Sequence, residues 1–403
     1  MSISSPAAFS PAGAAISSIG IVLRDFRLGG SERVAIGLAN YWASLSLDVV
    51  LIVGRGEGPL RELVDPAIEI VDLGLPAWLG DTVLAWALAM KARSVFSSRA
   101  IDRCYVPGNS HWPVIPALKS LRMSHRPLVV AQVSSPVCRE GRSSLEQAGY
   151  DWRMRWLLRG ADRITTLSED LARKTCSIIG RDAVEVVPLP ALWDEGRPCA
   201  PPAHTMTVLA AGRLVPIKGF DVLIRAFSLV ANRYFAAKLV LCGDGPERAR
   251  LEALVDELGL AGRVVFAGYV PSIRPYLDEA RVFVLSSHCE SYGAVLLEAL
   301  AAGRQVISTR CSPAVEALLT GPIAGRSVPV RDADAMAEAL CEILAEPAPD
   351  CDTLAEMVAP FHVSYGGRLY LSLMQPGDTK IEQAAAVDIS HSAWSHPAVT
   401  HSR

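Results

Sequence analysis

Residues 290–303 read Glu290-Ser-Tyr-Gly-Ala-Val-Leu-Leu-Glu298-Ala-Leu-Ala-Ala-Gly303, an apolar run framed by two carboxylates. The run predicts a helix that Gly293 begins and Gly303 ends, because glycine accepts the backbone conformations found at helix ends. Residues 294–302 are too apolar for a surface helix. We therefore expect Glu298 to be embedded among its apolar neighbours, which are Val295, Leu296, Leu297 and Leu300. A buried ionised carboxylate is costly unless donors surround it, so Glu298 predicts a ligand site.

The two carboxylates also indicate what kind of ligand this is. Helical side chains tilt toward the helix N-terminus, where backbone N–H groups and the helix dipole favour anions. Glu298 is therefore expected to lean toward a bound phosphate, within reach of sugar hydroxyls beside it. Glu290 precedes the helix and is expected on the far side of that phosphate. A ribose, a diphosphate and a second sugar would satisfy these groups, which predicts a nucleotide-sugar site.

Composition excludes several other classes of protein. The chain has 403 residues, of which 50% are hydrophobic and 20% charged, so two or more domains with large cores are expected. A net charge of −3 argues against nucleic acid as a partner. Nine cysteines without a C-x-x-C pair predict neither a disulfide framework nor a zinc site, and they fit a reducing cytoplasm. The N-terminus lacks a basic region, so a secretory signal is not expected.

Positive charge is concentrated in the first half of the chain. Residues 1–190 hold 21 Lys and Arg against 18 Asp and Glu, which leaves 18 against 24 for the remainder. Residues 91–163 are the most basic part, and they predict either a face toward anionic lipid or a phosphate-bearing acceptor, or an ordinary solvated surface. The longest apolar stretch, Pro76 to Met90, is shorter than the about 20 residues that span a bilayer. Any membrane contact is therefore expected to be peripheral.

Short apolar runs alternate with amphipathic segments, which is typical of parallel βαβ units. In the first half we predict seven strands, at 19–23, 49–53, 68–71, 104–106, 128–133, 164–167 and 184–187, with helices such as 31–44 and 169–179 between them. In the second half we predict strands at 206–211, 239–241, 264–266, 282–285 and 306–308, with helices at 220–230, 247–258 and 334–344. The pattern predicts an α/β protein with two doubly wound, Rossmann-like domains that face each other across a cleft.

The domain boundary is marked by proline. Five prolines crowd the junction: Pro188, Pro190, Pro198, Pro201 and Pro202. Proline has no N–H to give to a sheet and interrupts helices, so we predict a linker at 191–204 between domains at 1–190 and 205–357. A last helix at 358–374 is expected to cross back to the first domain within the segment 358–375. Residues 376–403 are polar and are expected to form a disordered tail.

A basic loop follows the predicted strand 206–211. It reads Gly212-Arg213-Leu-Val-Pro-Ile-Lys218-Gly-Phe220. Ligands of open α/β sheets bind at the carboxyl ends of strands, where this loop must lie. Arg213 offers a planar fork and Lys218 a mobile point charge to diphosphate oxygens. The alternative is that both cations are merely solvated, but a lysine just before a helix N-terminus is unfavourable without a ligand.

Two glycine-containing loops also follow predicted strands. Gly29 and Gly30 would let the backbone approach a phosphate or sugar closely, and Ser31 can cap the next helix; a plain turn is an equally good explanation. Gly243, in Gly-Asp-Gly-Pro, is more simply explained by a tight turn, although its loop should border the same cleft. We regard Gly243 as a secondary candidate for nucleotide contact.

Other motifs are absent or have simpler explanations. Asp332-Ala-Asp334 matches a metal-binding D-x-D pattern, but it begins a helix, where an acidic cap is expected. No glycine-rich dinucleotide fingerprint follows a strand, and the chain has neither a P-loop nor a hydrolase nucleophile elbow. Three His near the C-terminus lie in the polar tail and are not expected to bind metal.

Together these pieces resemble glycosyltransferase family 4, the retaining transferases of the two-Rossmann-domain GT-B fold. The resemblance rests on five motifs in the order of the family: residues 29–33, Ser168-Glu169, Arg213 with 218–221, residues 243–246, and the run 290–303. It covers residues 19 to about 345.

The resemblance implies roles for the candidate residues. Arg213 and Lys218 would hold the donor diphosphate, Glu298 the ribose hydroxyls, and Glu290 the transferred sugar near the reaction centre. The backbone of Ser291, Tyr292 and Gly293 would meet phosphate, and Gly29 and Gly30 would close on the donor from the other domain. The partners it implies are a nucleoside-diphosphate sugar and a glycan or lipid-linked acceptor in bacterial polysaccharide synthesis. No metal ion or other cofactor is expected, and the protein would work in the cytoplasm, at the inner face of the plasma membrane.

The chain departs from the family on the acceptor side. Many relatives have a histidine soon after the strand at 128–133, whereas this chain reads Val133-Ser-Ser-Pro136. His111 is a candidate replacement near the cleft, and a surface histidine at a helix start is an equal alternative. Two rival functions stay open: a nucleotide-sugar 2-epimerase on the same fold, and a non-catalytic nucleotide-sugar-binding subunit.

Overall fold

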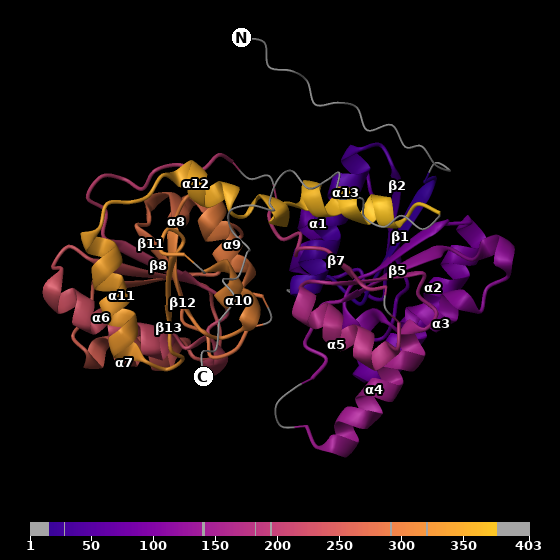
Figure 1. Ribbon diagram of the computed structural model, residues 1–403, viewed down its shortest axis with the longest axis horizontal. Coiled ribbons are helices and arrows are strands. Elements are labelled where there is room, and N and C mark those ends of the chain that lie inside the picture. Colours follow the sequence, from indigo (N-terminus) through magenta and orange to yellow (C-terminus); the bar gives the residue numbers. More distant parts are fainter. Residues whose placement is uncertain are drawn as a thin grey trace, which may run out of the picture.

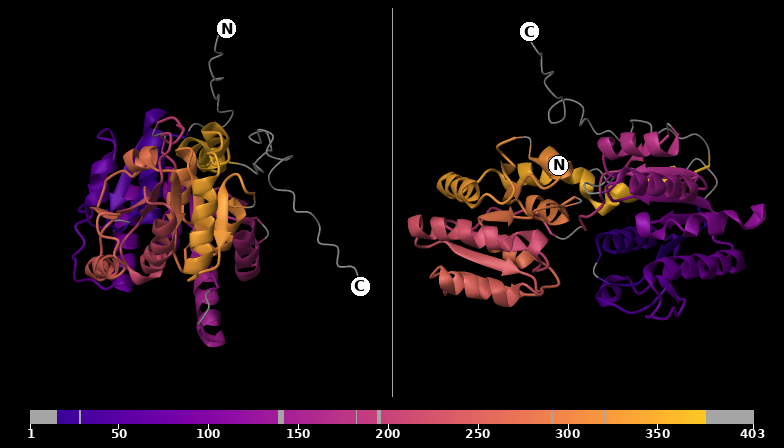
Figure 2. Two further views of the ribbon diagram at one scale, coloured as in Figure 1. Left: turned by 90° about the vertical axis from the view of Figure 1, so that its left-hand side faces the viewer. Right: turned by 90° about the horizontal axis from the view of Figure 1, so that it is seen from below.

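Two parallel α/β domains lie side by side in the computed structural model (Figure 1; seen from below in Figure 2). The structure describes residues 16–27, 29–138, 142–181, 183–193, 196–290, 292–319 and 321–376. The predicted tail beyond residue 376 therefore lies outside the described residues, as does Ser291. Among the described residues, no helix combines the length and apolar character needed to cross a bilayer.

The first domain is built on a seven-stranded parallel sheet in the order β3-β2-β1-β4-β5-β6-β7. Its strands are β1 Ser18–Leu23, β2 Asp48–Val53, β3 Glu69–Asp72, β4 Arg103–Val106, β5 Leu128–Val133, β6 Arg163–Thr166 and β7 Glu185–Val186. Its helices are α1 Gly30–Ser44, α2 Asp81–Arg99, α3 Val114–Lys119, α4 Ser144–Leu158 and α5 Glu169–Ile179. Helices α2 to α5 cover one face of the sheet, and α1 covers the other. The central strands are buried on both faces, which explains their continuous apolar sequences.

The second domain repeats this plan around a six-stranded parallel sheet in the order β10-β9-β8-β11-β12-β13. Its strands are β8 Thr207–Ala211, β9 Lys238–Cys242, β10 Val264–Gly268, β11 Val282–Leu285, β12 Gln305–Thr309 and β13 Gly325–Val328. Its helices are α6 Phe220–Arg233, α7 Arg248–Glu257, α8 Arg274–Glu279, α9 Ala294–Ala301, α10 Pro313–Leu318, α11 Ala333–Ala345 and α12 Cys351–Glu356. Helices α6, α7 and α11 pack on one face and α8, α9, α10 and α12 on the other. The predicted fold class is confirmed.

The chain crosses between the domains twice. The two crossings touch each other, because Leu192 on the first forms a β-bridge with His362 on the second. Helix α13, Val363–Leu373, then lies against α1 of the first domain, where the indole of Trp42 donates a hydrogen bond of 3.1 Å to the carbonyl of Gly367. In Figure 1 this yellow end of the chain runs across the top from the second domain to the first.

The prediction of one continuous helix at 358–374 was wrong. A short 3₁₀ turn at Ala359–Phe361 comes first, His362 is extended, and the α-helix begins only at Val363. Extended backbone at His362 is what allows its bridge to the first crossing. Strand β13 was also missed, because Arg326 and Ser327 interrupt its apolar run. As an edge strand, β13 forms its backbone hydrogen bonds with one neighbouring strand, β12. Gly325 allows β13 to approach Val306 of that strand closely.

Candidate functional site

Several of the predicted site residues lie at the carboxyl edge of the second sheet. The strand order reverses between β8 and β11, and this switch point is where open α/β sheets bind ligands. The loop after β8 carries Arg213 and Lys218, and the loop after β11 leads to Glu290. Residues that are far apart in the sequence therefore meet at one place.

Lys218 and Glu290 form an ion pair through Nζ and Oε1. The same carboxylate oxygen accepts a hydrogen bond of 2.8 Å from the Ser287 hydroxyl. Both charged side chains are largely buried, with 24% of Lys218 and 15% of Glu290 exposed. The sequence predicted both residues for one site, but not that they contact each other.

Gly219 allows the two loops to come this close. Its φ is +62°, and a Cβ built there would lie 2.2 Å from the carbonyl oxygen of Ser286. Ser286 in turn donates a hydrogen bond of 2.9 Å from its hydroxyl to the carbonyl of Lys218. Any residue larger than glycine would push the β8 loop away from the β11 loop and separate the ion pair.

Arg213 stands apart from this pair. Its side chain is exposed, and within the described part of the chain no hydrogen bond or ion pair to it is found. Gly243 packs against the residue before Arg213: its φ is +135°, and a Cβ there would lie 1.9 Å from the carbonyl oxygen of Gly212. The role of Gly243 in the structure is thus close backbone packing of two loops, while Arg213 is available to an anion.

Helix α9 begins at the site as predicted. Gly293 is its N-cap with φ of +72°, and side chains of Leu285 and Val315 surround the position where a Cβ would stand. Tyr292 packs its ring on Phe361 with centroids 5.7 Å apart, and burial raises the pKa of its phenol. The helix ends at Ala301, and Gly303 follows with φ of +80°.

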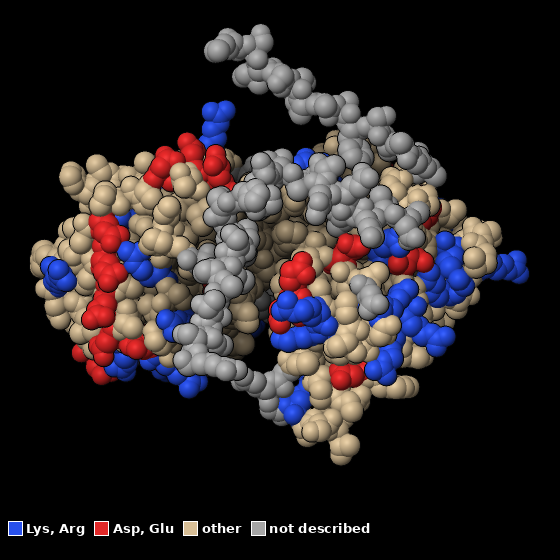
Figure 3. Space-filling view, viewed as in Figure 1, with Lys and Arg blue, Asp and Glu red and all other residues tan. Residues whose placement is uncertain are grey.

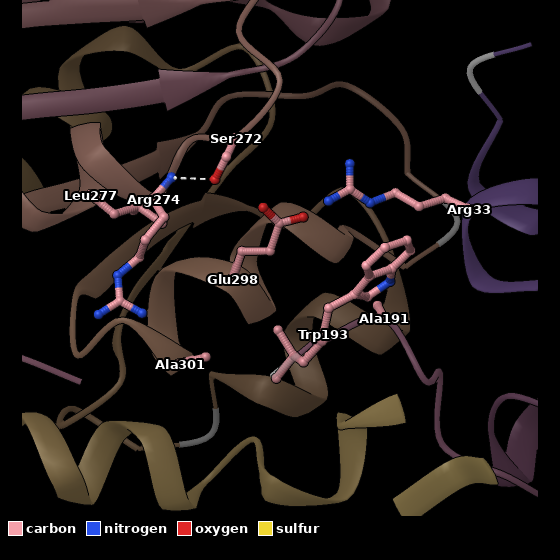
Figure 4. Close-up of a pocket in the computed structure, with 9 residues that line it drawn as sticks. Arg33, Ala191, Trp193, Ser272, Arg274, Leu277, Glu298 and Ala301 are labelled. Carbon is pink, nitrogen blue, oxygen red and sulfur yellow. Dashed lines mark hydrogen bonds between the residues drawn. The ribbon is translucent and has the colours of Figure 1, made fainter. Parts of the chain in front are cut away.

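Glu298 is not embedded among the leucines of α9, which corrects the prediction. Leu296, Leu297 and Leu300 face the core, while Glu298 lies half-buried on the opposite face. That face turns toward the first domain, where Glu298 shares a cavity with Arg33 and Trp193 (Figure 4). The cost of burying the carboxylate is avoided because the helix presents it to the space between the domains.

The cavity beside Glu298 is small in this structure. Its volume is about 40 Å³, and the guanidinium of Arg33 lies over the Trp193 ring at 5.5 Å from the centroid. A space of this size holds a water or two, not a nucleoside. On the other side of the β8 loop a wider depression of about 520 Å³ is lined by residues from both loops, including Ile217, His288 and Cys289. A nucleotide that reaches Glu298 would have to move Arg33 or Trp193.

The glycine loop of the first domain leads to this cavity. Gly29 is the N-cap of α1, and no side chain caps this helix, so the predicted cap by Ser31 was wrong. A Cβ on Gly108 would lie 2.8 Å from the hydroxyl oxygen of Ser31, so this side chain faces the loop after β4. Arg33, one turn into α1, reaches the cavity of Glu298. The sequence drew attention to the motif at 29–33 but assigned no role to Arg33, and nothing in it indicated Trp193.

His111 is neither at the cleft surface nor free to act on a ligand. It is only 1% exposed, its Nε2 accepts the backbone N–H of Arg24 at 3.1 Å, and its Nδ1 pairs with the carbonyl of Pro107. Burial lowers the pKa of its imidazole. Nε2 joins the loop after β4 to the loop after β1, and Nδ1 bonds within its own loop. The interpretation of His111 as a surface histidine was therefore wrong.

Acidic residues considered as metal ligands serve as helix caps. Asp332 accepts the N–H of Ala335 at 2.9 Å and caps α11. Among the described residues, one cluster has the spacing of a metal site: Asp350, Cys351 and Asp352 at the start of α12. Asp350 caps that helix by accepting the N–H of Thr353 at 3.0 Å. Neither group lies on the loops that carry Lys218 and Glu290.

Comparison with known proteins places this geometry in a family. Residues 29–191 match the family described as glycosyl transferase 4-like domain, and residues 205–346 match glycosyl transferases group 1. The lipopolysaccharide core biosynthesis glycosyltransferase LpsE of Rhizobium meliloti is 40% identical over 145 residues, which cover 36% of this chain and 41% of LpsE. The chain thus matches about two-fifths of the length of this relative.

Solved structures share the whole fold. A glycosyltransferase from Rickettsia africae has a TM-score of 0.70 at 16% identity, over 89% of this chain and 98% of the other. HepE of Anabaena, in complex with UDP, has a TM-score of 0.69 at 17% identity, over 89% and 99%. With both domain families matched in order and the two-sheet architecture shared, the chain belongs to the GT-B glycosyltransferases of the group 1 and family 4-like type.

Proposed function

We propose that this protein is a retaining glycosyltransferase that moves a sugar from a nucleoside-diphosphate sugar to a glycan or lipid-linked acceptor. The contact between Lys218 and Glu290 at the switch point carries this proposal. It places a cation that would bind phosphate against a carboxylate that would bind sugar, and the loop that carries Lys218 also carries Arg213, which has no side-chain partner among the described residues. A diphosphate-linked sugar needs all three groups.

The bound donor would replace the contact seen here. Lys218 would turn from Glu290 to the diphosphate, and Arg213 would bind its oxygens as a fork. Glu290, still held by Ser287, would then accept hydrogen bonds from hydroxyls of the transferred sugar. Glu298 would bind the ribose hydroxyls, and the N–H groups at the start of α9 would face phosphate.

In the transfer step the bond between the anomeric carbon and the diphosphate oxygen breaks, and the diphosphate keeps the electron pair. The acceptor hydroxyl forms the new bond from the same face and loses its proton to a phosphate oxygen. Arg213 and Lys218 stabilise the negative charge that develops on the diphosphate, which is the main electrostatic task. Because two cations supply this charge, we propose that the reaction needs no metal ion.

The acceptor class comes from similarity. LpsE is named for lipopolysaccharide core biosynthesis, and we propose that this chain also builds a bacterial surface polysaccharide on a glycan or lipid-linked precursor. Such precursors assemble at the cytoplasmic face of the plasma membrane, where we expect the protein to bind peripherally. We favour sugar transfer over a 2-epimerase or a non-catalytic subunit because the families and the relative that this chain matches are described as glycosyltransferases.

Thermal unfolding with UDP, GDP, ADP, TDP and CMP tests the donor site. A nucleotide present at 100 times its dissociation constant should add about 2.7 kcal/mol to the free energy of unfolding. The Lys218→Ala variant should lose that stabilisation, whereas Lys238→Ala, which removes an exposed lysine on β9, should keep it. No stabilisation by any nucleotide would contradict a preformed donor site.

Product analysis tests the reaction. NMR of the product should show the anomeric configuration of the donor, and EDTA should leave the rate unchanged. An inverted product, or a rate lost with EDTA and restored by a divalent metal, would refute the mechanism while leaving the donor site intact.

A further inference from the structure

Large apolar side chains stand exposed on one part of the first domain. On the segment before α2 and on α2 itself they are Trp78, 82% exposed, and Val83, Trp86 and Met90. On α4 they are Leu145, Trp152 and Trp156. A folded protein gains nothing by holding tryptophan in water, and exposed apolar patches mark binding surfaces.

We call these seven exposed side chains on and beside α2 and α4 the aromatic ridge. Val83, Trp86 and Met90 follow each other at helical spacing on α2, and Leu145, Trp152 and Trp156 do so on α4. The rings of Trp86 and Trp156 lie 5.9 Å apart and join the two helices. The five buried residues of α2 are all different from Val83, Trp86 and Met90. The exposed apolar face of the helix is therefore separate from the residues that it packs in the core.

The ridge is convex. Trp86 lies near the start of α2 but meets Trp156 near the end of α4, so the first turns of α4 extend beyond α2. Leu145 lies eleven residues before Trp156, or about 16 Å along the helix axis. Figure 1 shows α4 projecting from the body of the first domain. A projecting ridge suits insertion into a soft surface better than contact with a complementary protein groove.

Basic side chains accompany the ridge. Arg153 and Arg155 are exposed on α4, and Arg159 is exposed directly after it. The acidic residues of this helix are engaged locally: Glu146 accepts from Ser143 in a capping box, and Asp151 accepts from Gln147. Figure 3 shows Lys and Arg gathered on the part of the surface that overlies α2, α3 and α4. The acceptors Glu146 and Asp151 keep their negative charge, so the positive excess comes from the two helices together: residues 81–99 and 144–159 hold six Lys and Arg against three Asp and Glu.

We infer that the aromatic ridge docks this protein on an anionic lipid bilayer. Tryptophan partitions into the headgroup region because its ring is apolar and its indole N–H stays hydrated. Arginine beside it is attracted to anionic lipid, with a factor of about five in affinity for each charge near the surface. This inference rests on the proposed function, because a lipid-linked acceptor has to reach the cleft from a membrane.

The position of the ridge suits that task. Helices α2 and α4 both begin at the carboxyl edge of the first sheet, since each follows a parallel strand. Trp78 and Leu145 therefore lie at the same edge as the Gly29 loop, which leads to the cavity of Glu298. Docking by the ridge would bring the headgroup of a lipid-linked acceptor to the acceptor side of the cleft.

Vesicle co-sedimentation of the full chain tests the inference without donor or acceptor. The probes are vesicles of phosphatidylcholine alone and of phosphatidylcholine with an equal amount of phosphatidylglycerol. We expect binding to the mixed vesicles, loss of at least about ten-fold in affinity for the double variant Trp78→Ala, Trp152→Ala, and weakening by salt. The matched control is Phe235→Ala, which removes a ring 91% exposed on the second domain and should bind like the wild type.

Other results would overturn the inference. The first is that the wild-type protein does not bind the vesicles, and the second is that Phe235→Ala loses as much vesicle affinity as the double variant. The third is that light scattering shows wild-type dimers, which the double variant abolishes while its vesicle binding stays unchanged. The last result would make the ridge an interface between copies. The rate of sugar transfer to a water-soluble acceptor should be the same in both variants. If neither variant transfers sugar, that result would count against the proposed function and not against membrane docking by the ridge.

Discussion

Lys218→Ala should weaken nucleotide binding, whereas Glu290→Gln should not. The two side chains form an ion pair and neutralise each other. A diphosphate therefore has to compete with Glu290 for the ammonium group of Lys218. Glutamine keeps the shape of Glu290 and its contact with Ser287 but no longer holds Lys218 by charge.

The magnitudes follow from the burial of the pair. Breaking a fully buried ion pair costs about 3–5 kcal/mol, and exposed pairs contribute about 0–1 kcal/mol. With 24% and 15% of the two side chains exposed, we expect either variant to lose about 1–2 kcal/mol of stability. For a domain of this size that lowers Tm by roughly 3–6 °C and leaves the protein folded.

Binding and turnover should then separate. Lys218→Ala removes a cation that stabilises the leaving diphosphate, so kcat/KM should fall by about 10²–10³-fold and nucleotide affinity should fall with it. Glu290→Gln should leave the Kd for the nucleoside diphosphate unchanged or up to about ten-fold lower, because Lys218 is released, a gain of about 1.4 kcal/mol. Turnover should still fall sharply, because the sugar loses its carboxylate.

Isothermal titration with the nucleoside diphosphate, together with initial rates for the full donor, measures both effects. Equal weakening of nucleotide binding in the two variants would refute the reasoning, since it would mean that the pair acts as a structural unit. Unchanged nucleotide binding in Lys218→Ala would show that Lys218 does not reach the diphosphate.

Three further outcomes are expected. Arg213→Ala should change the free energy of unfolding by less than about 0.5 kcal/mol, because the exposed side chain has no partner among the described residues, yet weaken nucleotide binding in the same titration; a large loss of stability would contradict its placement. Burial lowers the pKa of His111 below the ordinary value of 6.5, so the unfolded chain binds its proton more readily, and stability in urea should fall as the pH drops below about 6.5. His111→Gln should flatten that pH dependence, and an unchanged slope would assign it to other groups. Gly367→Ala should cost about 1–3 kcal/mol in urea denaturation, because its Cβ would lie 2.3 Å from the Tyr41 ring, whereas Gly149→Ala on α4 meets no atom within 4 Å and should not destabilise.

Local signals in the sequence determined much of the architecture. Strands such as β5 and β11 were predicted at their observed bounds, because a central parallel strand is buried on both faces and its sequence is continuously apolar. Gly293 and Gly303 marked the ends of α9 because both positions have positive φ, which glycine tolerates without strain. The loops that follow strands were correctly expected to carry Arg213, Lys218 and Glu290, since parallel strands place their carboxyl ends along one edge.

Only the tertiary structure decided which partners these residues have. Three features join segments that are distant in the sequence: the ion pair between Lys218 and Glu290, the hydrogen bond from Arg24 to Nε2 of His111, and the cavity in which Arg33 and Trp193 meet Glu298. Periodicity reports which face of a helix is apolar, and α9 is apolar nearly all round. Whether Glu298 faces the other domain depends on how the two sheets pack against each other. The sequence of a single helix does not contain that information.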